Sequence, residues 1–221
     1  MTGSPAAGRV RLSAAEGQAL GEAAMRGAGY DAEEARLLAE HVMDAALSGY
    51  EYSGLPKLLN VVDDPLFARK GQPMRTVRDN GATALLDACQ ANGMIALARA
   101  ADDAARRAST HGVAVVVVAN CWMSGRSAVY CEKIANAGLV AIHSVAAPPS
   151  VAPFGGAARA LGTNPIAFGF PTADDPLVFD MGTSAFMGTD LQFRERLSAP
   201  IPAGVALDAG GRPTTDAAAA R

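Results

Sequence analysis

The sequence is poor in the features that mark several large classes of protein. Its three cysteines, Cys89, Cys121 and Cys131, are too few and too widely spaced for a disulfide framework or a paired metal-ligand motif. Lys and Arg number 19 against 22 Asp and Glu, with both signs interspersed, so no basic stripe can neutralise a nucleic acid backbone. We therefore expect a protein of a reducing compartment, without a metal site and without a nucleic acid partner.

Long hydrophobic runs are also missing. No stretch approaches the roughly 18 apolar residues that span a bilayer, and the N-terminal stretch MTGSPAAGRVR lacks the apolar segment of a signal peptide. We expect a cytoplasmic protein that does not bind membranes.

The apolar residues that are present follow helical and strand-like patterns. Half of the residues are hydrophobic, enough for a sizeable core. Ser13 and Glu16 predict a capping box before one helix, and Asp31 caps a second helix over about residues 32–47. Residues 27–32 also match the dinucleotide fingerprint G-x-G-x-x-A, but a helix precedes them where that motif requires a strand. We interpret them as a glycine helix stop followed by the aspartate cap.

From residue 82 onward, short strands alternate with helices. The runs ATALLDAC, VAVVVVAN and LVAIHSVAA predict strands, and the segments between them predict helices. This order favours parallel pairing and an α/β core, followed by strands at 166–171 and 177–182 and a helix within 184–198. The expected fold class is α/β, with a mixed sheet, flanking helices and an N-terminal helical segment. The expected organisation is a flexible N-terminus at 1–11, a helical region at 12–75, the α/β core at 76–200 and a C-terminal loop or tail at 201–221.

Four motifs carry a resemblance to a known family. They are GYEYSGLPKL, APFGGAARALGTNP, FDMGTS and IPAGVALDAGGRPTTD, in this order. From about residue 12 onward, the chain resembles the malate/L-lactate dehydrogenase family. The resemblance implies a non-Rossmann α/β fold, a homodimer, and NAD(P)-dependent interconversion of 2-hydroxy and 2-oxo acids or of related imines. It also implies longer chains in other members, so part of the usual cofactor and dimer surface is expected to be absent here.

Several matching positions depart from the family pattern. Ser53 and Met123 stand where the resemblance calls for two histidines, and Lys57 stands where it calls for an arginine. Val145 and Ala146 replace polar residues that lie near the cofactor in the family. Reduction of a ketone or imine needs a proton donor, and methionine cannot act as one. Loss of such a donor costs on the order of 10²- to 10⁴-fold in rate.

These departures favour a repurposed site. We expect a non-redox reaction, such as cyclisation, isomerisation or elimination, on a hydrophobic biosynthetic intermediate and without a cofactor, because the substitutions would make the pocket more aromatic and apolar. The residues expected to hydrogen-bond a carbonyl or to move a proton are Tyr52, Ser53, Ser124, Arg126 and His143. Those expected to line the substrate pocket are Glu51, Lys57, Trp122, Met123, Val145 and Ala146.

Two other functions remain open. The first is an NAD(P)-dependent oxidoreductase with a substituted proton donor, in which Asn164, Asp180 and Thr183 would contact the cofactor. The second is a non-catalytic binding or partner subunit.

Structural roles compete with the chemical ones at the same residues. Trp122 and Met123 would fill volume in the core, Arg126 would form a salt bridge, and Glu51 would lie in a surface turn. His143 would be a buried structural histidine.

Overall fold

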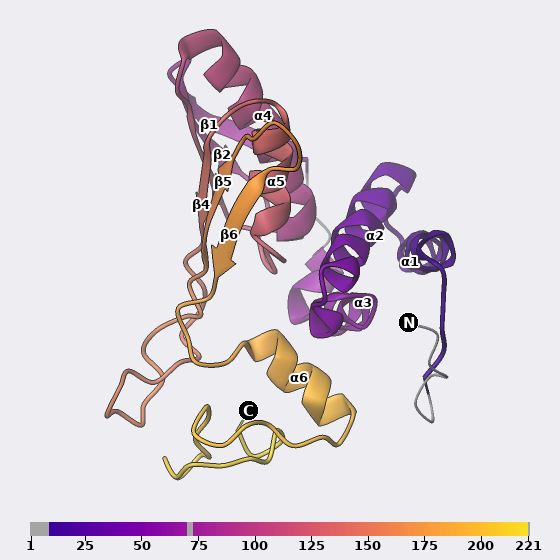
Figure 1. The fold of residues 1–221 in the computed structure, drawn as a ribbon, viewed down its shortest axis with the longest axis vertical. Helices are drawn as coiled ribbons and strands as arrows, with labels where there is room; N and C mark the ends of the chain where they lie inside the picture. The colour runs from indigo at the N-terminus through magenta and orange to yellow at the C-terminus, as the bar shows by residue number, and fades with distance from the viewer. Residues whose placement is uncertain (1–8, 70–72, 221) are drawn as a thin grey trace.

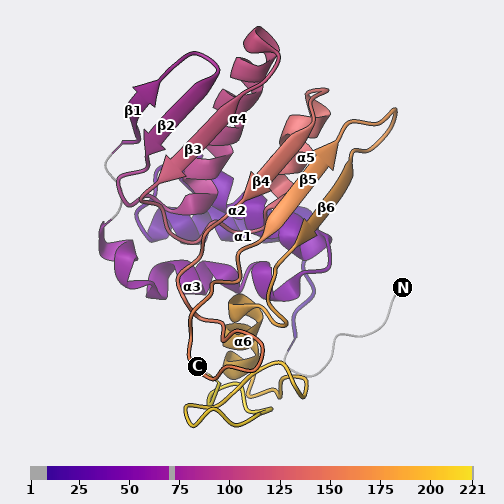
Figure 2. The same cartoon turned by 90° about the vertical axis from the view of Figure 1, so that its left-hand side faces the viewer.

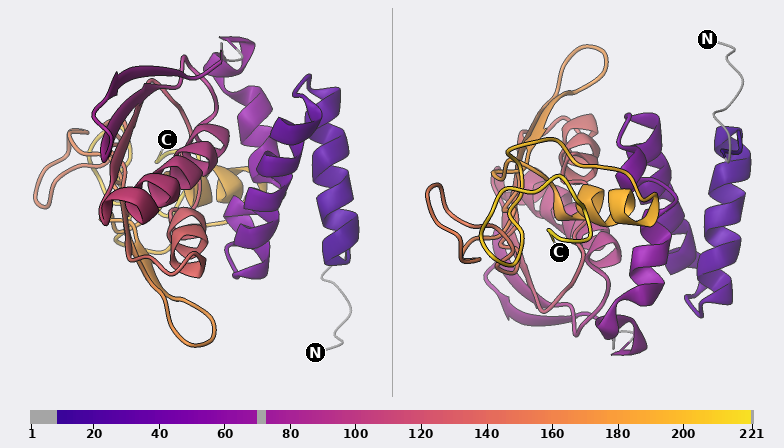
Figure 3. Two further views of the ribbon diagram at one scale, coloured as in Figure 1. Left: turned by 90° about the horizontal axis from the view of Figure 1, so that it is seen from above. Right: turned by 90° about the horizontal axis from the view of Figure 1, so that it is seen from below.

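The computed structural model describes residues 9–69 and 73–220, which form three layers (Figure 1). The strands make one layer, helices α4 (Gly93–His111) and α5 (Ala128–Asn136) pack on it, and the N-terminal helices lie beyond them. Figure 3 shows these layers end-on, with helix α6 (Gly188–Arg196) and the C-terminal tail visible from below. The α/β class predicted from the sequence is confirmed. Residues 1–8 of the predicted flexible N-terminus lie outside the described residues.

Two capped helices begin the described chain. Helix α1 covers Ala14–Gly27, and its N-cap Ser13 makes the predicted capping box with Glu16. Helix α2 covers Ala32–Leu47, with Asp31 as its side-chain cap. The caps place these starts where predicted because they satisfy backbone N–H groups that have no partner inside the helix. Three short elements follow, namely η1 (Glu51–Ser53), α3 (Lys57–Asp63) and η2 (Pro65–Arg69).

The six strands of the described residues form two three-stranded sheets. In the first, β1 is antiparallel to β2 and β2 is parallel to β3, whereas the second contains β4, β5 and β6 in antiparallel order. Strands β3 and β4 lie side by side in one layer (Figure 2), although they belong to separate ladders. The predicted parallel pairing is therefore right for β2 and β3 but wrong for β4, because the chain returns through a loop and pairs β5 with it in the opposite direction. The strand bounds are β1 Arg75–Asp79, β2 Thr83–Asp87, β3 Val115–Ala119, β4 Ala141–Ser144, β5 Ile166–Phe170 and β6 Leu177–Met181.

The largest core cluster lies between the N-terminal helices and α4. It includes Leu38 of α2, Val61 of α3 and Ile95 of α4, each with an exposed fraction of 1% or less. Two smaller clusters, around Leu86 and Cys131, attach the sheets to α4 and α5. This cluster thus packs α2, α3 and α4 together, and the candidate site described below begins at α3.

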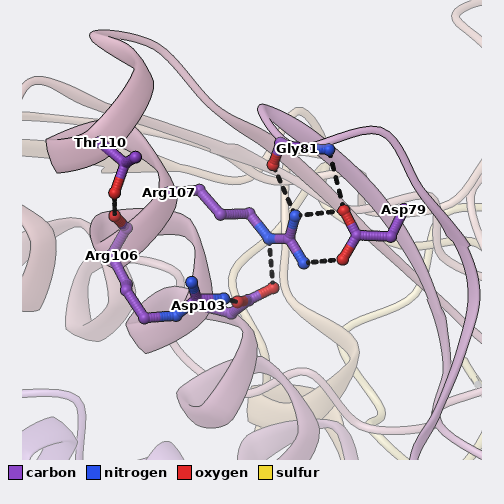
Figure 4. A network of polar contacts seen from close by, with 6 residues as sticks. All are labelled: Asp79, Gly81, Asp103, Arg106, Arg107 and Thr110. Carbon is purple, nitrogen blue, oxygen red and sulfur yellow. Dashed lines mark hydrogen bonds and ion pairs between the residues drawn. The ribbon is translucent and has the colours of Figure 1, made fainter.

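A buried arginine fastens α4 to the turn between β1 and β2 (Figure 4). Arg107 donates to both carboxylate oxygens of Asp79 at 2.7 and 2.6 Å and to the Gly81 carbonyl oxygen at 2.5 Å. Its Nε donates to Asp103, one helical turn earlier, at 2.7 Å. Hydrogen bonds from Arg107 hold the pKa of Asp79 well below its usual range. A bidentate pair of this kind fixes orientation, so the first sheet is held at a set angle to its helix.

Candidate functional site

The first residue of α3, Lys57, is buried, with an exposed fraction of 5%. Its Nζ donates to the hydroxyl of Thr189, near the start of α6, at 3.5 Å. Burial lowers the pKa of Lys57 to about 8, and no carboxylate of the described residues opposes that shift. A buried lysine is normally paired with an acid. Lys57 therefore offers a cation whose counter-charge is missing from the described part of the chain.

A cleft of about 430 Å³ lies between α3 and α6. Asn60 and Gln192 line it, and they stand one turn after Lys57 and Thr189 on the same faces of their helices. Met123 also borders the cleft, whereas most of the other lining residues are polar or charged. Of the residues expected to line the substrate pocket, only Met123 borders this cleft, and α6 and the end of α3 supply its polar side chains.

The residues of η1 lie immediately before the turn that leads into α3. Ser53 is buried, and Tyr52 is half-buried. Burial, with added repulsion from Tyr50, Asp190 and Asp180, raises the pKa of Tyr52 to about 12. Its hydroxyl thus stays protonated at neutral pH and can donate a hydrogen bond.

Glu51 points away from this cluster. Its carboxylate is exposed and forms an ion pair with Arg9, a residue that precedes α1. This position corresponds to the surface-turn alternative for Glu51, and the structure provides no contact between Glu51 and Lys57.

Trp122 and Met123 lie in different environments. Trp122 belongs to the large core cluster, and its indole N–H donates to the carbonyl oxygen of Gln90 at 2.9 Å. Met123 has a left-handed backbone with φ of 57° and reaches the cleft. The structure thus gives Trp122 a packing role, while Met123 is the residue of this loop that borders open space.

His41 of α2 holds the loop that follows Met123. Its Nε2 accepts a hydrogen bond from the backbone N–H of Arg126 at 2.8 Å. Gly125, with φ of 76°, leaves the room that His41 needs, because a Cβ atom there would collide with the imidazole. Burial, helped by the charges of Lys57 and Arg126, lowers the pKa of His41 to about 3, so the ring stays neutral and able to accept. No motif in the sequence singles out His41.

Arg126 and Ser124 serve the structure of the same loop. The Arg126 guanidinium forms ion pairs with Asp44 of α2 and, at 3.0 Å, with Glu132 of α5. The carbonyl oxygen of Ser124 accepts a hydrogen bond from the Tyr130 hydroxyl at 2.5 Å. Arg126 therefore takes the salt-bridge role that was the alternative to hydrogen-bonding a carbonyl.

His143 of β4 lies against the Tyr130 ring, with the ring centroids 5.0 Å apart. Both of its ring nitrogens are buried without a hydrogen-bond partner among the described residues, and burial lowers its pKa. A neutral imidazole of this kind is a poor proton donor at neutral pH. Beyond it, Val145 is half-buried and donates its backbone N–H to the Pro165 carbonyl oxygen, and Ala146 is exposed.

The three residues predicted to contact a cofactor are engaged within the fold. Asn164 Oδ1 accepts a hydrogen bond from the Ala147 backbone at 2.9 Å, and Asp180 accepts one from the first residue of α5 at 2.8 Å. The Thr183 hydroxyl donates to the Thr163 carbonyl oxygen at 3.2 Å. These side chains thus hold neighbouring segments of the fold together.

The structure thus brings together fewer residues than the sequence predicts. Lys57 contacts Thr189, which sequence reasoning missed, and Tyr52 and Ser53 lie close to Lys57 in the chain, while Met123 borders the cleft between α3 and α6. Within residues 9–69 and 73–220, no three His, Cys, Asp or Glu side chains are placed to hold a metal ion. No helix in that part of the chain has the length and apolarity needed to cross a bilayer.

Comparison with known proteins gives a consistent result. The family model described as malate/L-lactate dehydrogenase matches residues 12–221. Hydroxycarboxylate dehydrogenase B of Escherichia coli is 33% identical over 208 residues, which cover 89% of this chain and 56% of that protein. (2R)-3-sulfolactate dehydrogenase (NADP(+)) of Chromohalobacter salexigens is 32% identical over 217 residues, which cover 95% of this chain and 63% of that protein.

A solved structure agrees with these matches. Δ1-piperideine-2-carboxylate reductase from Pseudomonas syringae superposes with a TM-score of 0.82 at 29% identity, over 96% of this chain and 64% of that one. The chain therefore spans less than two thirds of the length of each of these proteins. The match over residues 12–221 and the shared fold establish that the chain belongs to the malate/L-lactate dehydrogenase family.

Proposed function

We propose that this chain carries the carboxylate-binding part of an NAD(P)-dependent oxidoreductase that acts on 2-hydroxy and 2-oxo acids or on related cyclic imino acids. The observation that carries the proposal is the buried ammonium of Lys57, which has a hydroxyl partner at 3.5 Å and no acidic partner among the described residues. Lys57 lies one helical turn before Asn60, which lines the cleft between α3 and α6.

The physical reason is charge compensation. An unpaired charge in a poorly hydrated site is costly, and the cost falls when a carboxylate supplies the opposite charge. Two of the named relatives, hydroxycarboxylate dehydrogenase B and Δ1-piperideine-2-carboxylate reductase, have a carboxylate in their names. A carboxylate is therefore the substrate group that best fits Lys57, and Thr189 would hold the ammonium in place.

The neighbouring side chains suit a hydrogen-bonding role. Tyr52 keeps its proton at neutral pH, so its hydroxyl can donate to a carbonyl or imine of the bound acid. Met123 can contribute only packing, since a thioether has no proton to give. Tyr52 thus replaces Ser53 and His143 as the preferred donor, although its high pKa makes it a weak acid.

The comparisons favour this oxidoreductase proposal over the non-redox reaction expected from the substitutions. The relatives described above are dehydrogenases or a reductase, and one name includes NADP(+). The cleft between α3 and α6 is lined mostly by polar side chains and adds no support for a hydrophobic intermediate. The expected lack of a cofactor gains no support, and the homodimer stays a prediction.

Calorimetric titration with oxamate, a carboxylate analogue of a 2-oxo acid, tests the anion site without requiring turnover. Lys57→Met should weaken oxamate binding at least about tenfold, in line with the loss of a charged hydrogen bond. Lys133→Met is the matched control, because Lys133 is exposed and pairs with Asp102. Equal affinity in the Lys57 variant and the wild type would contradict the carboxylate role.

A second measurement separates the redox part of the proposal from the anion site. Fluorescence titration should show that NADPH and NADH bind. Turnover assays with 2-oxo acids and cyclic imino acids should then show that the reduced cofactor is oxidised. Oxamate binding without either result would retain the Lys57 site and reject the oxidoreductase assignment for this chain.

A further inference from the structure

Two elements that lie next to Lys57 are packed very differently. Its ammonium donates to Thr189 of α6, while burial together with the charge of Lys57 lowers the pKa of His41 on α2. Helix α2 is anchored in the large core cluster through Leu38 and Val42, whereas no residue of α6 is buried. Of the two, α6 is therefore the element that can move away from Lys57 more easily, since few buried apolar contacts oppose its opening.

Polar contacts at both ends of α6 hold it against α3 (Figure 2). At its start is the contact between Lys57 and Thr189, at 3.5 Å. At its end, Arg196 donates to Asn60 Oδ1 at 3.0 Å and to Asp63 Oδ2 at 2.7 Å. The side chains of Arg196 and Asp63 are 40% and 61% exposed, so water competes for this ion pair and it is weak. The polar contacts between α6 and α3 are thus ones that water can replace.

The chain has a possible pivot on either side of α6. Gly188 is the first residue of the helix, and no atom outside its own stretch of chain lies within 4 Å of the position that a Cβ would take. Ser198, two residues after the helix, has a left-handed backbone with φ of 50°. Hinges are commonly a few residues at the ends of an element that absorb changes in φ and ψ. These two positions are therefore where α6 can turn as a unit.

We propose that α6 is a lid over Lys57, and that it swings away from α3 before a small carboxylate can reach the ammonium. A lysine that is only 5% exposed cannot contact a ligand while the helix that covers it stays in place. Opening replaces the polar contacts of Thr189 and Arg196 with contacts to water, and closing over a bound carboxylate restores the shielded site. The role of the lid rests on the proposed carboxylate site, whereas its movement requires no ligand.

Chemical labelling of lysines tests the lid in the 221-residue chain without a ligand. Acetylation by an N-hydroxysuccinimide ester, followed by peptide mass spectrometry, reports how often the Lys57 amine becomes accessible. Arg196→Met removes both contacts of Arg196 with α3, so it should speed acetylation of Lys57 about threefold, as expected for the loss of an exposed ion pair. Lys133, which is exposed, is the internal reference and should be labelled at an unchanged rate.

Arg36→Met is the matched control variant. Arg36 forms an ion pair of similar exposure with Glu40, but both residues lie on α2, so its loss should leave the labelling of Lys57 unchanged. Amide hydrogen exchange separates opening of the lid from general unfolding. The amides of α6 should exchange faster in Arg196→Met, whereas those of α4, which belongs to the large core cluster, should not.

Two results would overturn the lid. One is a rate of Lys57 acetylation that Arg196→Met leaves unchanged. The other is equal acceleration of amide exchange in α6 and α4, because Lys57 would then be exposed by unfolding of the whole chain.

Oxamate distinguishes the lid from the site that it serves. Slower acetylation of Lys57 in the presence of oxamate supports both proposals. No protection by oxamate, in a chain whose α6 opens as expected, rejects the carboxylate site and retains the lid.

Discussion

The N-terminal half and the C-terminal half of the molecule are held together in different ways. In the first, α1 to α4 share the large cluster that contains Leu38 and Ile95, and Arg107 fastens α4 to the first sheet. In the second, a cluster of three buried residues around Cys131 attaches α5 to the second sheet, and α6 has no fully buried residue. Since Lys57 belongs to the first half and Thr189 to the second, the candidate site joins a strongly packed region to a weakly packed one.

Substitution in the large core cluster should lower the free energy of unfolding more than substitution in the C-terminal half. Leu38→Ala is expected to lower the free energy of unfolding by about 3 kcal/mol, because a fully buried leucine leaves a cavity. Val178→Ala in the second half should cost only about 1 kcal/mol, since Val178 is partly buried. Urea denaturation followed by circular dichroism measures both.

Leu20→Ala is the control, because Leu20 lies exposed on α1 and should change the free energy of unfolding by less than about 0.5 kcal/mol. Equal losses for Leu38→Ala and Val178→Ala would break the comparison between the two halves.

Lys57→Met, in the strongly packed N-terminal half, should raise the free energy of unfolding, because the buried charge of Lys57 destabilises the fold. Burial lowers the pKa of Lys57 from 10.5 to about 8, which corresponds to roughly 3 kcal/mol of destabilisation by the charged form at neutral pH. Methionine has a similar length and no charge, so the variant should unfold at higher urea concentration at pH 7.

The pH dependence gives the sign of this effect. The unfavourable contribution is fully present below about pH 8, where Lys57 is charged in both states, and it disappears as the pH rises toward 10.5. The difference between Lys57→Met and the wild type should therefore shrink between pH 8 and 10.5. A constant difference across this range would show that the substitution acts through packing and not through charge.

The smallest expected effect concerns the attachment of the first sheet. Hydrogen bonds from Arg107 lower the pKa of Asp79, so they stabilise the fold above the unfolded pKa and are lost as the pH falls through the folded one. Asp79→Asn should lower the melting temperature at pH 7, and the difference from the wild type should narrow below about pH 4. Asp102→Asn provides a surface comparison, because Asp102 pairs with exposed Lys133.

Local sequence signals predicted the parts of the fold that local physics determines. The capping residues Ser13 and Asp31 marked the helix starts, and the valine-rich run marked β3. Strand β1 escaped prediction because its residues, RTVRD, are all exposed and mostly polar. The antiparallel pairing of β4 with β5 could not be predicted, since it depends on the path of the loop between residues 145 and 165.

The candidate site was predictable only in part for the same reason. Lys57 was found through its position in a motif, whereas its contact with Thr189 joins residues 132 positions apart. His41 carries no local signal, because its role depends on the distant Gly125 and Arg126. Trp122 was predicted as a pocket residue with core packing as the alternative, and the structure buries it in the large core cluster with its indole N–H on the Gln90 carbonyl oxygen.

The span between Lys57 and Thr189 has a consequence for how the protein is assembled. A contact over 132 positions carries a loop-closure cost, and it exists only in molecules in which α6 lies against α3. A carboxylate that binds there recognises only chains in which both ends have met. By mass action it would raise the population of completed molecules, with about 2.7 kcal/mol of stabilisation at a hundredfold excess over its Kd. The substrate would then act as a folding ligand as well as a reactant, and its cellular concentration would help set how much of the protein persists.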